Sequence, residues 1–172
     1  MIVPVSEEEY LGTAYEPDCE FEDGALIERN LGEQDHSWLQ TALAAYFFRR
    51  RRLWGIEVFT GQRHRIRAGK YMLPDVCVIK QPLVWIFSRP AEKVFSRPPL
   101  IWIEILSPED RPLKVNDKVR QAIEFGVPNV WVIDPETFEA EIHTPAGSRK
   151  VGDRILRVQD SPISVPLDGF DE

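Results

Sequence analysis

Residues 100–135, LIWIEILSPEDRPLKVNDKVRQAIEFGVPNVWVIDP, read as a strand, a helix and a second strand in succession. The apolar run at 100–106 has the length and the β-branched content of a buried strand. A helical pattern near 114–125 leads to Gly126, and a second apolar run follows at 129–133. Strands joined through a helix pair in parallel, with a right-handed crossover. This stretch therefore predicts an α/β core.

The rest of the chain predicts an N-terminal helix and hairpin, a long helix and further strands around this core. Ser6 and Glu9 form a capping box for the first helix, and Asp35 is the expected N-cap of the long helix. Asp23-Gly24 is the expected turn of the hairpin. The expected helices span 6–12 and 35–52, the hairpin spans 19–29, the strands span 56–60, 63–67, 73–79, 138–143 and 154–158, and residues 81–99 form a loop with a short helical piece.

Two acidic side chains stand in apolar runs, where an unpaired charge is costly. Asp75 belongs to the run 73–79, and Glu104 belongs to the run 100–106. Burying a carboxylate without a cation or hydrogen-bond donors to compensate it costs several kcal/mol. Two such carboxylates also repel each other, and a shared divalent metal would resolve both problems. The pair therefore predicts a metal site formed by neighbouring strands.

A lysine on the following helix is the third candidate. Strand alternation places Glu104 on the face of Trp102 and Leu106. Lys118 lies at the edge of the apolar face of the helix, from which its ammonium could reach Glu104, and Gln121 is a further candidate one turn on. Other interpretations stay open: Glu104 as an exposed or arginine-paired acid, Asp75 as a residue that introduces a strand, and Lys118 as a snorkelling lysine.

Two more polar residues are candidates near the N-terminus. Glu20 alternates with Phe21 in the expected hairpin, so it lies on the face opposite that aromatic ring. His36 falls in the first turn of the long helix. There it is either a partly exposed or helix-terminal histidine, or a functional residue that binds phosphate or adjusts a proton transfer.

Two groups of arginines raise the question of nucleic-acid contact. Arg63, Arg65 and Arg67 recur at a spacing of two, so they line one face of a strand. Either a solvated strand face or a stripe that follows a phosphate backbone explains this spacing. The arginine run 49–52 fits the end of a helix, where positive charge favours the negative end of the dipole.

The overall composition restricts the class of protein. The 172 residues fit one domain, residues 1–172, and a hydrophobic fraction of 43% supplies a core. A net charge of −7 argues against loose, non-specific nucleic-acid binding but leaves room for a local basic groove or a metal-bridged phosphate. We expect a cytoplasmic protein with reduced cysteines, because Cys19 and Cys77 are far apart in the sequence. We expect no secretory signal, and no membrane span because no apolar stretch is long enough to cross a membrane.

Several of these segments together resemble the Uma-two family of restriction-endonuclease-like proteins, in the PD-(D/E)XK nuclease superfamily. The resemblance rests on Pro74-Asp75, on residues 104–108, on Asp117-Lys118 and on residues 126–135, and the hairpin at 19–24 with His36 also fits. It implies a restriction-endonuclease-like core, in which a mixed β-sheet is flanked by helices, and a homodimer. The acid–x–lysine triplet of the superfamily is not intact, since Leu106 stands two residues after Glu104; the lysine has moved to the next helix as Lys118.

The resemblance also implies a function, a DNA endonuclease that uses Mg²⁺, with Mn²⁺ as the other possible ion. Asp75 and Glu104 would bind the metal, with Glu20 as a further ligand or water-orienting group. Lys118 would position the attacking water or stabilise charge on the phosphate, and His36 would assist at the margin of the site. The alternatives are a catalytically inactive nuclease-fold module for binding or assembly, and a metal-dependent hydrolase of small phosphoesters.

Overall fold

A six-stranded mixed sheet forms the centre of the fold. The computed structural model describes residues 4–30, 32–81 and 92–170. The strand order is β10-β9-β8-β7-β6-β3, and only β7 and β8 pair in parallel among these neighbours. The bounds are β3 (Ile56–Thr60), β6 (Val76–Lys80), β7 (Ile101–Ile105), β8 (Val130–Ile133), β9 (Ala140–Thr144) and β10 (Gly147–Lys150).

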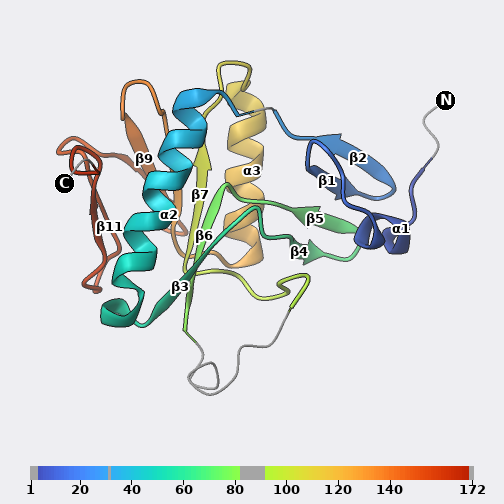
Figure 1. Cartoon of the computed structure of the whole chain (residues 1–172), viewed down its shortest axis with the longest axis horizontal. Helices are drawn as coiled ribbons and strands as arrows, with labels where there is room; N and C mark the ends of the chain where they lie inside the picture. Colours follow the sequence, from blue (N-terminus) through green and yellow to red (C-terminus); the bar gives the residue numbers. More distant parts are fainter. Residues whose placement is uncertain (1–3, 31, 82–91, 171–172) are drawn as a thin grey trace.

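Two smaller sheets lie at opposite ends of the molecule (Figure 1). The four-stranded sheet has the order β2-β1-β5-β4, and it lies beside the N-terminal helix α1 (Glu7–Gly12). Its strands are β1 (Cys19–Glu22), β2 (Ala25–Glu28), β4 (His64–Arg67) and β5 (Lys70–Met72). Tyr10 of α1 packs on Phe21 and Tyr71, with ring centroids 5.0 and 5.4 Å apart. The C-terminal pair β11 (Ile155–Arg157) and β12 (Ser164–Pro166) forms the third sheet.

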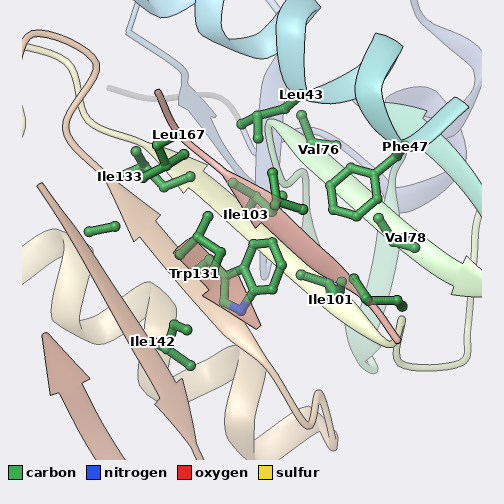
Figure 2. Packing of buried hydrophobic residues seen from close by; sticks show 14 of the residues in the cluster. Leu43, Phe47, Val76, Val78, Ile101, Ile103, Trp131, Ile133, Ile142 and Leu167 are labelled. Carbon is green, nitrogen blue, oxygen red and sulfur yellow. The ribbon is translucent and has the colours of Figure 1, made fainter. Parts of the chain in front are cut away.

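Strand β7 divides its side chains between two helices, as alternation predicts. Ile101 and Ile103 pack in the main core with Leu43 and Phe47 of α2 (Gln34–Trp54), as Figure 2 shows. Trp102 points the other way, into a second cluster with residues of α3 (Pro112–Phe125). The two long helices therefore cover opposite faces of the central sheet. Within the described residues, no helix has the length and apolar character needed to cross a membrane.

Most of the expected elements are present where the sequence predicts them. Strand β3 has the expected bounds, and the unit β7-α3-β8 has the predicted parallel pairing. Ser6 caps α1 by accepting a hydrogen bond from the backbone N–H of Glu9 at 3.1 Å. The hairpin β1-β2 turns at Asp23-Gly24, where both residues have positive φ angles.

Three expectations about the elements were wrong. Glu33, not Asp35, occupies the N-cap of α2, and the helix continues past 52 to Trp54 because the left-handed backbone needed to end it comes only at Gly55. The expected strand 73–79 is broken, since Pro74 has no N–H to donate to a ladder and β6 begins only at Val76. Strand β10 was missed because all four of its residues are exposed and carry no apolar alternation.

The loop predicted at 81–99 is described only in part. Residue 81 and residues 92–99 contain no helix, and residues 82–91 lie outside the described residues. After this gap, the backbone of Phe95 pairs with β4: its N–H donates to the carbonyl of Arg63 and its carbonyl accepts from Arg65, both at 2.9 Å.

Two adjacent phenylalanines of α2 test the core assignment. Phe47 is fully buried and Phe48 is 50% exposed. We expect Phe47→Ala to lower the free energy of unfolding by about 3–5 kcal/mol, because it removes a large buried ring and leaves a cavity. Phe48→Ala, the matched control, should cost less than about 1 kcal/mol. Urea denaturation of both variants measures the difference, and equal losses would contradict this packing.

Candidate active site

The chain crosses from the small sheet to the central sheet at Leu73-Pro74-Asp75, and this crossing creates the site. The backbone N–H of Asp75 donates to the carbonyl of Ile103 at 3.0 Å. Its side-chain Oδ2 accepts the backbone N–H of Ile105 at 2.7 Å. Gln40 of α2 donates to the backbone carbonyl of Asp75 at 2.8 Å. Backbone and side-chain bonds therefore fix the Asp75 carboxylate against β7.

Two nitrogen-bearing side chains face this carboxylate. Arg29 forms an ion pair with Oδ1 of Asp75. The Nε2 atom of His36 lies 3.4 Å from Oδ2. Burial alone would raise the pKa of Asp75, but the hydrogen bond from His36 and the charge of Arg29 hold it below its ordinary value. Asp75 is therefore a buried, ionised carboxylate at neutral pH.

Glu104 lies on the opposite face of β7 from Ile103, where Trp102 and α3 cover it. The indole N–H of Trp102 donates to Oε1 of Glu104 at 2.7 Å, and the Lys118 ammonium lies 3.4 Å from Oε2. Burial raises the pKa of Glu104 to about 7; Lys118 opposes this shift, while the charges of Asp75 and Glu20 add to it. Glu104 therefore exchanges its proton near neutral pH.

Lys118 connects Glu104 to the small sheet. Its Nζ lies 3.3 Å from Oε1 of Glu20, a buried residue of β1, and the same oxygen accepts the backbone N–H of Leu73 at 3.2 Å. Burial would lower the pKa of Lys118, but the carboxylates of Glu104 and Glu20 outweigh it and raise the pKa. The Lys118 ammonium, a permanent cation, thus lies between Glu20 of the small sheet and Glu104 of the central sheet.

These groups line one cleft of about 240 Å³ between the two sheets and α3. Gln121 also lines the cleft, as predicted, and so do several other charged side chains. Carboxylates outnumber cations around it: the acids are Glu20, Glu22, Glu28, Asp75, Glu104, Asp110 and Asp117, and the cations are Arg29, Lys70, Lys114 and Lys118. Such a cleft repels a polyanion unless further positive charge enters.

The carboxylates of the cleft are donors of the kind that a hard divalent cation binds, and Lys118 lies between two of them. Carboxylate oxygens are the ligands that Mg²⁺ and Mn²⁺ prefer. Among residues 4–30, 32–81 and 92–170, no three His, Cys, Asp or Glu side chains lie close enough together to form a metal-binding cluster. Burial is the largest cause of the raised pKa of Glu104, and the charges of Asp75 and Glu20 add to it.

The contacts of His36 define the orientation of its imidazole ring. Its Nε2 donates to Asp75, and its Nδ1 is buried without a hydrogen-bond partner in the part of the chain that the structure describes. A neutral ring that donates from Nε2 carries its lone pair on Nδ1. This histidine therefore orients Asp75 from the first turn of α2.

All five residues predicted for the site line the same cleft: Glu20, His36, Asp75, Glu104 and Lys118. Their catalytic roles stay predictions. Sequence reasoning missed Arg29 and Gln40, whose contacts with Asp75 span 46 and 35 residues and leave no local pattern. The indole of Trp102 was also missed as a partner of Glu104, although its position on the same face two residues earlier was a usable signal.

The three arginines around β4 are bound within the protein. Arg63 donates to the carbonyl of Thr13 at 3.0 Å, Arg65 lies 3.6 Å from Glu7, and Arg67 lies 3.0 Å from Glu22. These contacts tie β4 to the N-terminal helix and hairpin. Hydrogen bonds or ion pairs within the protein thus occupy all three arginines, and their spacing alone gives no support to a stripe along a phosphate backbone.

The fold and family of the chain follow from two comparisons. The mixed sheet, its two covering helices and the acidic cleft define the restriction-endonuclease-like class. The chain belongs to the Uma2 (Uma-two) family, described as "Putative restriction endonuclease", whose model matches residues 8–168. This confirms the predicted resemblance and fold class.

Solved structures share the architecture, and one of them illustrates the similarity. A crystal structure from Anabaena variabilis, described as "a putative nuclease belonging to DUF820", matches with a TM-score of 0.74 and 22% sequence identity over 90% of this chain and 89% of that chain. At this identity, the similarity concerns the fold. A search of curated proteins found no match.

The raised pKa of Glu104 predicts that this residue destabilises the folded protein at alkaline pH. The folded-state pKa of about 7 lies above the ordinary value of 4.5, so the folded protein binds more protons between these values and its stability falls as the pH rises through them. We expect Glu104→Gln to raise the free energy of unfolding at pH 8 by about 1–3 kcal/mol.

Chemical denaturation at two pH values measures this effect. The gain from Glu104→Gln should shrink at about pH 4.5, where the carboxyl is largely protonated in the folded state and needs no neutralisation. The Gln side chain keeps an oxygen for the Trp102 indole, and Lys118 keeps its contact with Glu20, so the two packing partners are retained. A variant that is less stable than the wild-type protein at pH 8 would contradict the assignment.

Proposed function

We propose that this protein is a divalent-metal-dependent endonuclease that hydrolyses phosphodiester bonds in DNA. Three buried carboxylates and one lysine that face a single cleft are the observation that carries the proposal. Two other facts support it: the chain belongs to a family described as restriction endonucleases, and a structure described as a nuclease has the same fold. A homodimer, which the resemblance implies, remains part of the proposal.

The charge of the cleft supports a metal requirement. Its carboxylates outnumber its cations, so DNA phosphate would be repelled from the metal-free protein. Asp75 and Glu104 would hold the ion, with Glu20 as a further ligand or as a group that orients water. When bound, Mg²⁺ or Mn²⁺ would neutralise the acids, polarise the phosphodiester and lower the pKa of a water molecule.

The protein's own residues supply the remaining roles. Lys118, held between Glu20 and Glu104, offers a fixed positive charge to the phosphate as negative charge develops during hydrolysis. His36 and the backbone N–H of Ile105 hold the Asp75 carboxylate in its orientation. The Trp102 indole does the same for Glu104. Each acid is thus positioned before substrate arrives.

The second candidate is a nuclease-fold module that binds or assembles without turnover. One observation favours it: Arg29 and Lys118 already pair with the carboxylates, so the buried charges are compensated without any metal. In a protein of this kind, neutralising Asp75 or Glu104 would chiefly change stability, because Arg29 or Lys118 then loses a buried carboxylate partner. The activity test separates the two candidates.

We expect Asp75→Asn and Glu104→Gln to reduce Mg²⁺-dependent DNA cleavage at least about a hundredfold, because each removes a charge that organises the reacting groups. Lys118→Met should have a comparable effect. Nicking and linearisation of supercoiled DNA, with Mg²⁺, Mn²⁺ or chelator, measures the rate.

The control variant is Asp168→Asn, whose carboxylate is 62% exposed, pairs with Arg154 and lies outside the cleft. It should cleave at the wild-type rate. Full activity in both Asp75→Asn and Glu104→Gln would refute the assigned roles. A wild-type protein that cleaves no DNA with either metal would favour the binding module.

Mg²⁺ binding should release protons near neutral pH. Because the pKa of Glu104 is about 7 and a ligating carboxylate is deprotonated, the ion displaces the Glu104 proton when it binds. Calorimetric titration at about pH 6.5, in two buffers that differ in ionisation enthalpy, counts the released protons.

The same titration at about pH 8.5 is the internal control. There Glu104 is already ionised, so proton release should disappear and the affinity for Mg²⁺ should be higher. Binding at pH 6.5 without any proton release would remove Glu104 from the set of ligands.

A further inference from the structure

Arg29 is a charged residue of the cleft that has no role in the proposed chemistry. It follows β2 directly, its side chain is 17% exposed, and its guanidinium pairs with Oδ1 of Asp75. Burial would lower the pKa of Arg29, but the charges of Asp75, Glu104 and Glu20 raise it. The guanidinium is therefore a permanent cation that faces the three acids.

The position of Arg29 conflicts with an ion on Asp75. Oδ2 of Asp75 already accepts the backbone N–H of Ile105, and Oδ1 is the oxygen that Arg29 occupies. A divalent cation bound to Asp75 would compete for that oxygen and would repel the adjacent guanidinium. Arg29 and a metal ion would therefore compete for this carboxylate.

Two other cations of the cleft pair with carboxylates other than Asp75. Lys118 has two carboxylate partners, at 3.3 and 3.4 Å, and Lys70 pairs with Glu22 at 2.7 Å. Arg29 has Asp75 as its one ion-pair partner among the described residues. Its backbone N–H donates to the carbonyl of Asp18 at 3.2 Å, so the main chain of Arg29 is anchored independently of its side chain.

A guanidinium displaced from Asp75 remains at the cleft and needs an anionic partner. Its planar donors match the oxygens of a phosphate and form paired hydrogen bonds with them, which an ammonium does not. A DNA phosphate held by the same metal ion would bring such oxygens to the site.

We propose that Arg29 is an exchanging, substrate-binding residue: it pairs with Asp75 in the metal-free protein and moves to a phosphate oxygen of DNA when a divalent cation binds Asp75. This inference rests on the proposed metal-dependent function, and it adds a residue that binds the substrate phosphate. It also makes the ion pair with Asp75 a block that prevents phosphate binding before the metal arrives.

Two binding measurements on the full chain test the exchange without requiring cleavage. Calorimetric titration with MgCl₂ alone measures metal affinity, and fluorescence anisotropy of a short labelled DNA duplex, with Ca²⁺ in place of Mg²⁺, measures substrate affinity. We expect Arg29→Gln to bind Mg²⁺ about tenfold more tightly, because a competing cation is gone, and to bind DNA about tenfold more weakly. A purely structural role would not produce these opposite changes.

Two further variants complete the test. Arg29→Lys keeps the competing charge but loses the planar donors, so it should bind Mg²⁺ like the wild-type protein and bind DNA more weakly. Arg154→Gln, the matched control, removes an arginine that pairs with Asp168 at 2.8 Å, outside the cleft, and both affinities should stay at the wild-type level.

The outcomes separate this inference from the proposed function. Unchanged or weaker Mg²⁺ binding by Arg29→Gln, or unchanged DNA binding, overturns the exchange. The exchange is also overturned if the wild-type protein binds no Mg²⁺. A wild-type protein that binds Mg²⁺ and DNA but does not cleave overturns the nuclease proposal, while opposite shifts in Arg29→Gln still support the exchange.

Discussion

The ammonium of Lys118 lies between a carboxylate of the small sheet and a carboxylate of the central sheet, and the arrangement of the cleft depends on this contact. Without it, Glu20 and Glu104 would be two buried negative charges that repel each other. With it, residues from β1, β7 and α3 form one electrostatic unit. The same cation that would act on a phosphate is therefore also a cross-link between the two sheets.

The carboxyl groups of Asp75 and Glu104 respond to their surroundings with pKa shifts in opposite directions. Asp75 receives a backbone N–H, a histidine and an arginine, and its pKa is lowered. Glu104 lies among apolar groups and near two other acids, and its pKa rises to about 7. Pairs of titratable groups whose pKa values are shifted apart in this way are typical of sites where protons are exchanged. The surroundings of the two carboxyl groups, rather than their identities as Asp and Glu, cause the opposite pKa shifts.

The central unit of the fold was predictable because local patterns specify it. Alternation along 101–105 assigned Glu104 to the face of Trp102, and the helical period placed Lys118 at the edge of α3, where both are found. The break at Pro74 was harder to foresee, because the apolar residues on either side of it join different sheets. The pairing of Arg29 with Asp75 was not predictable, since only the assembled sheets bring these residues together.

The terminal strand β10 bears on the behaviour of the protein in solution. Among the strands that the structure describes, it pairs with β9 alone; all of its residues are exposed, and it ends with Arg149 and Lys150. An unpaired sheet margin invites another chain to add a strand, and basic side chains there disfavour such additions by mutual repulsion. The basic residues of β10 therefore oppose the addition of further chains to this edge of the central sheet, which would lead to fibres. The same charged, exposed sequence is the reason that β10 was not predicted as a strand.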